Sequence, residues 1–168
     1  MKQNPMKQKI SQKADQNLRA VRNITGVAGE YFVAAELSRR GWIAVLTLKN
    51  TPNIDLIATT PDGKRTVNIQ VKTRSAANRK GWIFDRGIET IVPGNNFYIA
   101  LVDLQETDSK PDYYIIPKNL LAKWIGKGHR DWLAAPGRKG RARVDNPIRA
   151  LPKSQFHVFE EYHNNWNL

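Results

Sequence analysis

Residues 54–73 read "IDLIATTPDGKRTVNIQVKT", and this stretch decides the fold. Apolar and polar residues alternate on both sides of the Asp62-Gly63 dipeptide, a pattern typical of two β-strands joined by a hairpin turn. With an even-length loop centred between residues 62 and 63, the numbers of paired residues sum to 125. Asp55 then lies directly opposite Gln70 on the same face, with about 5 Å between their Cβ atoms.

The same register sorts the rest of the hairpin into two faces. Lys72 shares the face of Gln70, because side chains two apart on a strand point to the same side. A slip by one residue would exchange the two faces, and the regular alternation of the sequence opposes that slip. The opposite face is expected to meet the core and carries Ile54, Leu56, Ala58, Val67, Ile69 and Val71.

A helix is predicted ahead of this hairpin, over residues 25–41, "TGVAGEYFVAAELSRRG". Thr25 is a suitable N-cap, and Gly41 suits the left-handed residue that ends many helices. Glu30 falls on the same apolar stripe as Leu37, which is expected to face the core. An acid in such a place costs free energy unless it is paired or binds a cation. Glu30 is therefore a fourth candidate for a site.

These side chains together suit metal-assisted hydrolysis of a phosphodiester bond. Mg²⁺ (or Mn²⁺) is expected, because Mg²⁺ prefers oxygen ligands: one or two carboxylates, with water and phosphate oxygens. We expect Asp55 to anchor the ion, with the side-chain oxygen of Gln70 and the backbone carbonyl of Val71 as further ligands. Lys72 would position and activate the attacking water, or stabilise charge on the phosphate. Glu30 would bind the ion through water or orient Lys72.

The helix and hairpin, "GVAGEYFVAAELSRRGW" and "NIDLIATTPDGKRTVNIQVKT", resemble the restriction-endonuclease-like PD-(D/E)XK nuclease superfamily. The likeness is closest to branches with a helical acid, such as archaeal Holliday-junction resolvases, and covers roughly residues 24–75. Glu30 matches the helical acid, Asp55 the strand acid, Gln70 the variable acid position and Lys72 the lysine. The resemblance implies a central mixed sheet flanked by helices and Mg²⁺-dependent cleavage of DNA.

Position 70 departs from the commoner form of this pattern, which has Glu where this chain has Gln70. Some methyl-directed restriction enzymes of the superfamily also carry Gln there. An amide removes one negative charge from the site, so Mg²⁺ binding should be weaker. The alternative is a catalytically weak or inactive nuclease-fold protein that binds DNA or RNA.

The rest of the chain predicts an α/β (α+β) protein with a mixed central sheet flanked by helices. Residues 1–24 carry six basic residues and one acid and are expected to form a mobile basic arm, with a helix over part of it as the alternative, and a single domain is expected over 25–168. A basic loop is expected after residue 135. Strands are expected at 42–48, around "WIF" near residue 83, at 97–104 and 112–117, and one or two short helices at 118–135, broken near Gly126 and Gly128.

Charge is the strongest signal in the composition. The 168 residues include 27 Lys and Arg against 15 Asp and Glu, giving a net charge of +12 and a pI near 10.1. Such a balance favours a polyanionic partner, because neutralising phosphates releases counterions. Nucleic acid, most of all DNA, is preferred over a membrane, since no basic amphipathic helix has a strong apolar face. The absence of cysteine excludes disulfides and thiol catalysis and fits a cytoplasmic protein.

Basic residues near the hairpin and in the C-terminal part are the candidates for phosphate contacts. Residues 117–153 hold ten Lys and Arg against two acids. The candidates are Arg74, Arg79, Lys80 and Arg86 after the hairpin, and Arg138, Lys139, Arg141 and Arg143 in the basic segment. Trp82 is expected in the core, and His129 is interpreted as a helix-end residue packing beside Trp132. Cutting both strands of a duplex usually needs two active sites, which favours a homodimer.

Overall fold

The computed structural model describes residues 5–48 and 51–168 of the chain. Three helical turns of the 3₁₀ type, η1 to η3, accompany two α-helices and seven strands. In chain order the elements are α1 (Pro5–Ser38), β1 (Ile43–Leu46), β2 (Leu56–Thr59), β3 (Thr66–Arg74), β4 (Gly81–Asp85), η1 (Arg86–Glu89), β5 (Phe97–Asp103), β6 (Asp112–Pro117), α2 (Lys118–Ala134), η2 (Arg138–Gly140), β7 (Ile148–Pro152) and η3 (Lys153–Tyr162).

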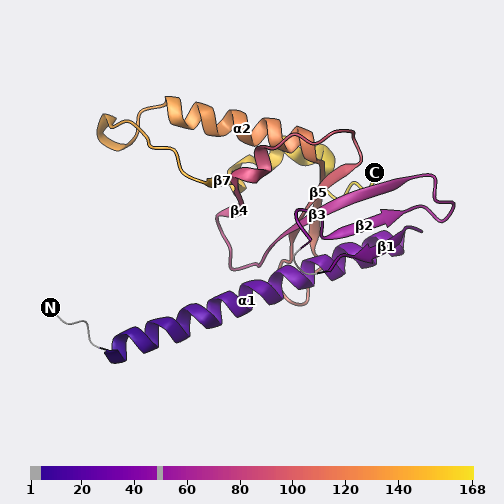
Figure 1. The fold of residues 1–168 in the computed structure, drawn as a ribbon, viewed down its shortest axis with the longest axis horizontal. Coiled ribbons are helices and arrows are strands. Elements are labelled where there is room, and N and C mark those ends of the chain that lie inside the picture. The colour runs from indigo at the N-terminus through magenta and orange to yellow at the C-terminus, as the bar shows by residue number, and fades with distance from the viewer. Residues whose placement is uncertain (1–4, 49–50) are drawn as a thin grey trace.

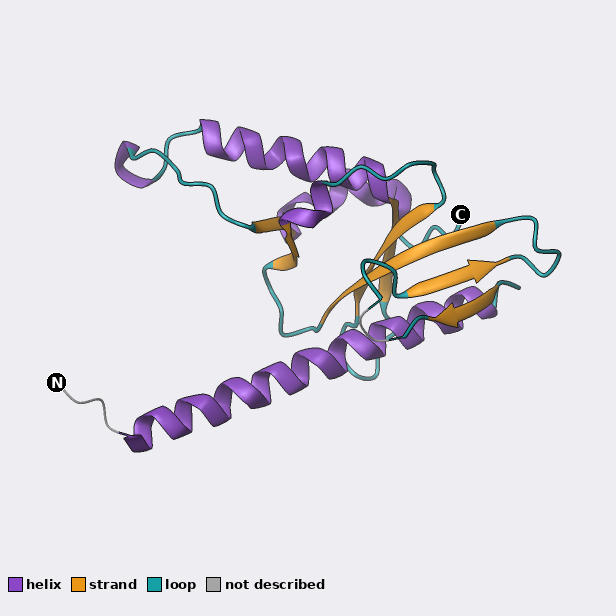
Figure 2. Cartoon of the chain, in the orientation of Figure 1, coloured by secondary structure: helices purple, strands orange, loops and turns teal. Residues whose placement is uncertain are grey.

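A five-stranded mixed sheet forms the centre of the molecule, in the order β1-β2-β3-β5-β6. Its neighbouring strands are antiparallel except β3 and β5, which run parallel. Helix α1 covers one face of this sheet and α2 lies on the other side (Figure 1, Figure 2). This three-layer arrangement confirms the predicted class, a mixed central sheet flanked by helices.

The hairpin of β2 and β3 has the predicted register. Leu56 pairs with Ile69 and Thr59 pairs with Thr66, so the numbers of paired residues sum to 125. The Asp55 N–H donates to the Ile69 carbonyl at 2.9 Å, so the regular pairing ends at Leu56 and the chain leaves the ladder at Asp55. Asp55 stays in contact with β3, and its place directly opposite Gln70 remains a prediction.

Two apolar cores lie on the two faces of the central sheet. The first is between α1 and the sheet, and includes Val33, Leu37, Leu56, Ala58, Val67, Ile69 and Val71. The second lies between the sheet, α2 and the small β4–β7 sheet, and includes Trp82, Phe84, Ile99, Leu101, Leu121 and Ile125. The polar face of β3 therefore looks toward the second core and α2.

Helix α1 begins far earlier than the sequence suggested. It runs from Pro5 to Ser38, so the expected start at Thr25 is wrong. The Thr25 hydroxyl donates instead to the Val21 carbonyl at 2.9 Å, within the helix. The N-terminal half of α1 extends beyond the sheet (Figure 1). None of the helices in the described residues is long and apolar enough to cross a membrane.

The end of α1 is the one predicted. Gly41 has a φ of 85°, the left-handed conformation that glycine adopts without strain. The Trp42 N–H donates to the Leu37 carbonyl at 3.1 Å and the Gly41 N–H to the Ser38 carbonyl at 3.0 Å. This pair of hydrogen bonds is a Schellman motif, in which Trp42 also packs with Leu37 in the first core.

Helix α1 and strand β3 meet at Gly29 and Thr73. A Cβ atom at position 29 would lie 1.9 Å from Thr73 Oγ1 and 2.9 Å from Thr73 Cβ. The absence of a side chain at Gly29 is what lets the helix approach the strand this closely. The contact fixes α1 over the C-terminal end of β3, one residue beyond Lys72.

The second half of the chain contains one strand that the sequence did not reveal, and one helix longer than expected. Strand β7 pairs antiparallel with β4 inside the segment predicted as a basic loop. Helix α2 runs unbroken through Gly126 and Gly128. Gly126 is buried and lies beside Glu89 of η1, where a Cβ would be 3.6 Å from Glu89 Cγ, an ordinary contact distance.

The C-terminal tail closes the outer edge of the sheet along β6. The Asn164 N–H donates to the Tyr113 carbonyl at 2.7 Å, and the Tyr113 N–H donates to Asn164 Oδ1 at 3.1 Å. Trp166 packs edge-on against Tyr113, with ring centroids 5.1 Å apart. The aromatic tail thus takes the place of a sixth strand.

Candidate functional site

Strand β3 presents two adjacent polar side chains on the face that looks toward α2. Gln70 and Lys72 are half-buried and lie beside Ile99 and Leu101 of the parallel strand β5, both in the second core. Neither the Gln70 amide nor the Lys72 ammonium has a hydrogen-bonding partner among the described side chains and backbone groups. Polar groups in this setting cost free energy unless a ligand or water satisfies them.

Asp55 stands at the point where the β2–β3 hairpin opens. Its Oδ2 atom accepts a hydrogen bond from the Val71 N–H at 2.7 Å. This hydrogen bond replaces the strand-pairing bond that the Val71 N–H would otherwise make. It holds the Asp55 carboxylate against the β3 backbone, between Gln70 and Lys72. A second carboxylate oxygen, Oδ1, remains for another ligand.

Gln70 and Lys72 line a small cavity of about 130 Å³. Its other walls come from β4, η1 and the start of α2, and Asn53 borders it from the loop before β2. Asp55 is not among the lining residues, although the Asn53 loop leads directly to it. The cavity is roughly large enough for a few water molecules or one phosphate-sized group.

Lys118 is a site residue that the sequence did not identify. It opens α2, is only 4% exposed and lines the same cavity as Gln70 and Lys72. Its Nζ atom donates to the carbonyls of Ile88 at 2.6 Å and Thr90 at 2.8 Å. Burial lowers the pKa of Lys118, and the Asp85 carboxylate opposes that shift. An ammonium has three donors, so one remains for a ligand in the cavity.

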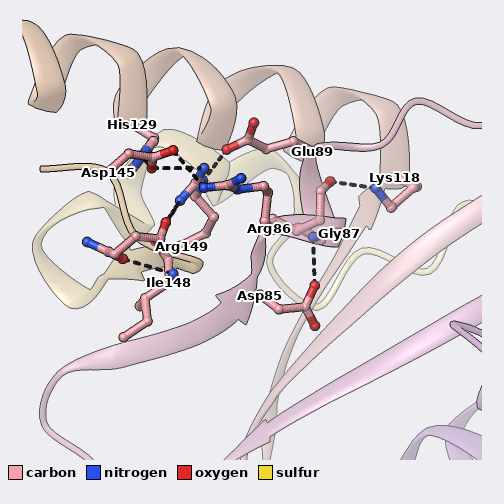
Figure 3. A network of polar contacts seen from close by, with 11 residues as sticks. Asp85, Arg86, Gly87, Glu89, Lys118, His129, Asp145, Ile148 and Arg149 are labelled. Atoms are coloured by element: carbon pink, nitrogen blue, oxygen red, sulfur yellow. Dashed lines mark hydrogen bonds and ion pairs between the residues drawn. The ribbon is translucent and has the colours of Figure 1, made fainter.

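Asp85 brings a carboxylate to the same cavity from the end of β4. Its Oδ1 atom accepts from the Gly87 N–H at 2.7 Å and caps η1 (Figure 3). With Lys72 and Lys118 on the opposite walls, the cavity has two ammonium groups and one carboxylate. This arrangement can hold an anionic oxygen such as that of a phosphodiester.

Glu30 lies on the other side of the sheet from Gln70 and Lys72. It is half-buried on α1, directly after Gly29, and α1 packs on the face of β3 that carries Val71 and Thr73. The structure therefore groups Gln70 and Lys72 with Lys118 at one cavity, and Glu30 is not among the residues that line it. A role for Glu30 in metal binding or in orienting Lys72 stays a prediction.

The predicted ligands suit a cation that keeps part of its water shell better than a cation bound by protein ligands alone. No group of three or more His, Cys, Asp or Glu side chains able to hold a metal ion occurs in the described part of the chain. The predicted ligands are one carboxylate from Asp55, the amide oxygen of Gln70 and the Val71 carbonyl. Mg²⁺ accepts such a set, because it commonly keeps several waters and takes one or two carboxylates with phosphate oxygens.

Arg74 does not lie where a phosphate contact requires it. It is 6% exposed, forms a buried ion pair with Asp103 and donates to the Asn78 carbonyl at 2.6 Å. Its guanidinium lies 5.4 Å from the ring centroid of Trp82, which is in the core as predicted. Arg74 is the last residue of β3, and the strand's alternation points it inward. We therefore leave it out of the phosphate contacts.

The other predicted basic residues are at or near the surface. Arg79 and Lys80 are exposed in the loop between β3 and β4. Arg86 is 58% exposed and paired with Asp145 at 2.6 Å. In the basic segment, Arg138, Lys139 and Arg141 are exposed and Arg143 is half-buried.

Comparisons with known proteins were made for the whole chain. No protein-family model and no curated protein matches it. The bacterial homing endonuclease I-Ssp6803I is 14% identical with a TM-score of 0.43, and the alignment covers 60% of this chain and 72% of that one. Hjc, a Holliday junction resolvase from Archaeoglobus fulgidus, is 15% identical with a TM-score of 0.44, with 79% and 88% covered.

At these identities and TM-scores the similarity concerns the arrangement of helices and strands alone. The function of this chain has to be inferred from the contacts made by its own residues.

Proposed function

We propose that this protein is a metal-dependent endonuclease that hydrolyses phosphodiester bonds in DNA. The observation that carries the proposal is the pair Gln70 and Lys72, side by side at a small cavity and next to the fixed carboxylate of Asp55. The net charge of +12 supports a polyanionic substrate.

Each residue has a defined task in this proposal. Asp55 and the Gln70 oxygen, with the Val71 carbonyl, hold Mg²⁺ (or Mn²⁺), which supplies Lewis-acid polarisation of the phosphate. Lys72 orients the water that attacks phosphorus and stabilises the charge that develops on the phosphate oxygens. Lys118 holds a phosphate oxygen from the opposite wall of the cavity. The water oxygen forms a bond to phosphorus and gives up a proton to solvent, the P–O bond to the leaving sugar oxygen breaks, and that oxygen takes a proton from solvent.

A second candidate function is nucleic-acid binding without cleavage. Gln70 is the specific observation that favours it, because a neutral amide at this position leaves Asp55 as the one carboxylate among the three proposed metal ligands. Replacing Gln70 by Glu separates the two candidates. If Gln70 limits catalysis by weak metal binding, Q70E lowers the Mg²⁺ concentration that cleavage needs.

The direct test is cleavage of end-labelled DNA by the purified protein with Mg²⁺ or Mn²⁺. We expect Asp55→Ala and Lys72→Ala to abolish cleavage while leaving DNA binding largely intact. Asp62→Ala and Lys64→Ala are the matched controls, because they remove the same charges from exposed positions in the same hairpin. Both controls should cut at the wild-type rate.

The substrate panel decides between the remaining alternatives. It contains duplex, single-stranded and branched DNA together with a structured RNA. Binding without cleavage of any member would leave the binding-only candidate, and cleavage of the RNA alone would replace DNA as the substrate. Two active sites are needed to cut both strands at once, so a homodimer is expected if the products are double-strand breaks.

A further inference from the structure

A second and larger cavity lies away from the hairpin, between the C-terminal half of α2 and strand β7. Its volume is about 580 Å³, within the range of small-molecule sites. Two tryptophans contribute to its walls, with apolar residues of β7 and two side-chain amides. The residues that matter here are Trp124, Trp132, Ile148, Pro152, Asn146 and Gln155.

A network of ion pairs braces the wall that faces η1 (Figure 3). Arg149 has a side chain only 3% exposed, and it pairs with Glu89 of η1. It also donates to the carbonyls of Asn146 at 2.6 Å and Ile148 at 3.0 Å. Because these bonds join β7 and the loop before it to η1, the cavity is formed before any ligand arrives.

Trp132 gives the cavity a flat aromatic surface at its mouth. It is 39% exposed. His129 stacks on it, with ring centroids 5.4 Å apart and an interplanar angle of 23°. The Arg143 guanidinium lies 4.9 Å from its ring centroid. Both the His129 ring and the Arg143 guanidinium already pack on this indole, so a nucleotide base, which has the same flat face, would stack there by displacing one of them.

Hydrogen-bonding groups and positive charge accompany this aromatic surface. Asn146 accepts the Ile148 N–H at 2.9 Å through Oδ1, which leaves its amide NH₂ for a ligand. Arg138, Lys139 and Arg141, in the loop that leads to Arg143, have no acidic partner among the described residues. A ligand that combines flat aromatic rings with negative charge matches both features, and nucleic acid has this chemistry.

The two cavities lie on either side of the short turn η1. Gly87 and Ile88 line the small cavity, and the next residue, Glu89, binds Arg149 in the wall of the large one. Helix α2 also spans both, because Lys118 lines the first and Ile125, on the same face of the helix and about 10 Å further along its axis, lines the second. One nucleic-acid strand can therefore reach both cavities.

We propose that the α2–β7 cavity receives an unstacked base of a single-stranded DNA segment, next to the phosphate held at Lys72 and Lys118. The proposal rests on the proposed function for the choice of nucleic acid and for the phosphate at Lys72 and Lys118. Bases inside a duplex are stacked and cannot enter such a cavity without being extruded. The cavity thus selects DNA with unpaired bases, such as a single strand or the branch point of a junction.

The test measures binding without metal, so that it does not depend on cleavage. A fluorescently labelled single-stranded DNA and its duplex are titrated with protein in EDTA. We expect Trp132→Ala to weaken single-strand binding about tenfold and to leave duplex binding unchanged. Trp132→Phe, which keeps a flat ring, should recover most of the affinity. Tyr31→Ala removes an exposed aromatic residue from α1 and is the matched control.

Three outcomes would contradict the base-binding proposal. Equal single-strand affinity for wild type and Trp132→Ala, equal losses for single strand and duplex, or preference for an RNA oligonucleotide would each overturn the base-binding proposal. Thermal unfolding of both Trp132 variants checks their folding, and Trp132→Phe keeps the test valid if the alanine variant is unstable. If single-strand binding depends on Trp132 and no substrate is cut, the base-binding proposal stands and the nuclease proposal fails.

Discussion

Lys118 carries a buried positive charge at the candidate site, and its hydrogen bonds explain how that charge is tolerated. Two of its donors are fixed on the Ile88 and Thr90 carbonyls, so the ammonium is held still beside Gln70 and Lys72. Lys118 lies far from β3 in the sequence and opens a helix. Only the packing of α2 against η1 and β5 brings it to the site, so no local pattern could have predicted it.

We predict that Lys118→Met lowers the cleavage rate and the affinity for DNA phosphates together. The variant also leaves two buried carbonyls without a donor, which should cost about 1–3 kcal/mol of unfolding free energy. Cleavage rate, DNA affinity at several salt concentrations and thermal unfolding are measured together. A loss of stability with cleavage and salt dependence unchanged would mean that Lys118 only supports η1.

Gly29 and Gly26 give a matched pair of substitutions at the scale of the helix. A Cβ at position 29 would collide with the stiff, β-branched side chain of Thr73, whereas one at position 26 would meet nothing within 4 Å. We expect Gly29→Ala to lower the unfolding free energy by about 1–3 kcal/mol. Gly26→Ala should raise it by about 0.5–1 kcal/mol through helix propensity.

Chemical denaturation of both variants tests this pair of predictions. If Gly29→Ala were as stable as wild type, α1 could not be packed on β3 as closely as described. Adding Thr73→Ala to Gly29→Ala should restore part of the loss, because the second substitution removes the Oγ1 and Cγ2 atoms that the new Cβ would meet.

Local sequence predicted some elements well and others poorly, for physical reasons. The β2–β3 hairpin and the end of α1 were predictable, because an Asp-Gly turn with regular alternation and a left-handed glycine are local signals. The first half of α1 and strand β7 lack such signals. Strand β7 is only five residues long and follows a basic loop, and its partner β4 lies more than sixty residues earlier.

For the site, the sequence predicted that Asp55 lies against β3. It did not predict that Asp85 and Lys118 line the same cavity as Gln70 and Lys72. Register arguments hold within one hairpin, and they set Asp55, Gln70 and Lys72 on one face. They say nothing about which sheet face a preceding helix covers, so the predicted role of Glu30 beside Lys72 stays a prediction. Asp85 and Lys118 depend on the long-range packing of β4 and α2.

Across the whole molecule, the aromatic tail and the first core meet at Tyr113, which makes the fold sensitive to high pH. Burial, and then the charge of Glu36, raise the pKa of Tyr113 from 10 to about 12. A phenol whose pKa is higher in the folded state contributes stability below pH 10, and that stability is lost as the pH rises through 12. The slope is at most about 1.4 kcal/mol per pH unit.

We therefore predict that the wild-type protein loses unfolding free energy between pH 10 and 12 faster than Tyr113→Phe does. Denaturation curves of both proteins at pH 8, 10 and about 11 measure the difference. Tyr31→Phe, at a position 62% exposed, is the control and should follow the wild type. Parallel curves for wild type and Tyr113→Phe would show that the Tyr113 phenol is not shielded from water.

The C-terminal clasp on β6 has a consequence for aggregation. Strand β6, "DYYIIP", is apolar and stands at the border of the sheet, where unpaired N–H and C=O groups can recruit a strand from another molecule. Asn164 and its neighbours occupy that border. If the tail alone detached while the rest of the fold stayed intact, the unpaired backbone groups of β6 would be exposed to strands of other molecules. We therefore expect that removing the contacts of the tail with Tyr113 promotes self-association without global unfolding.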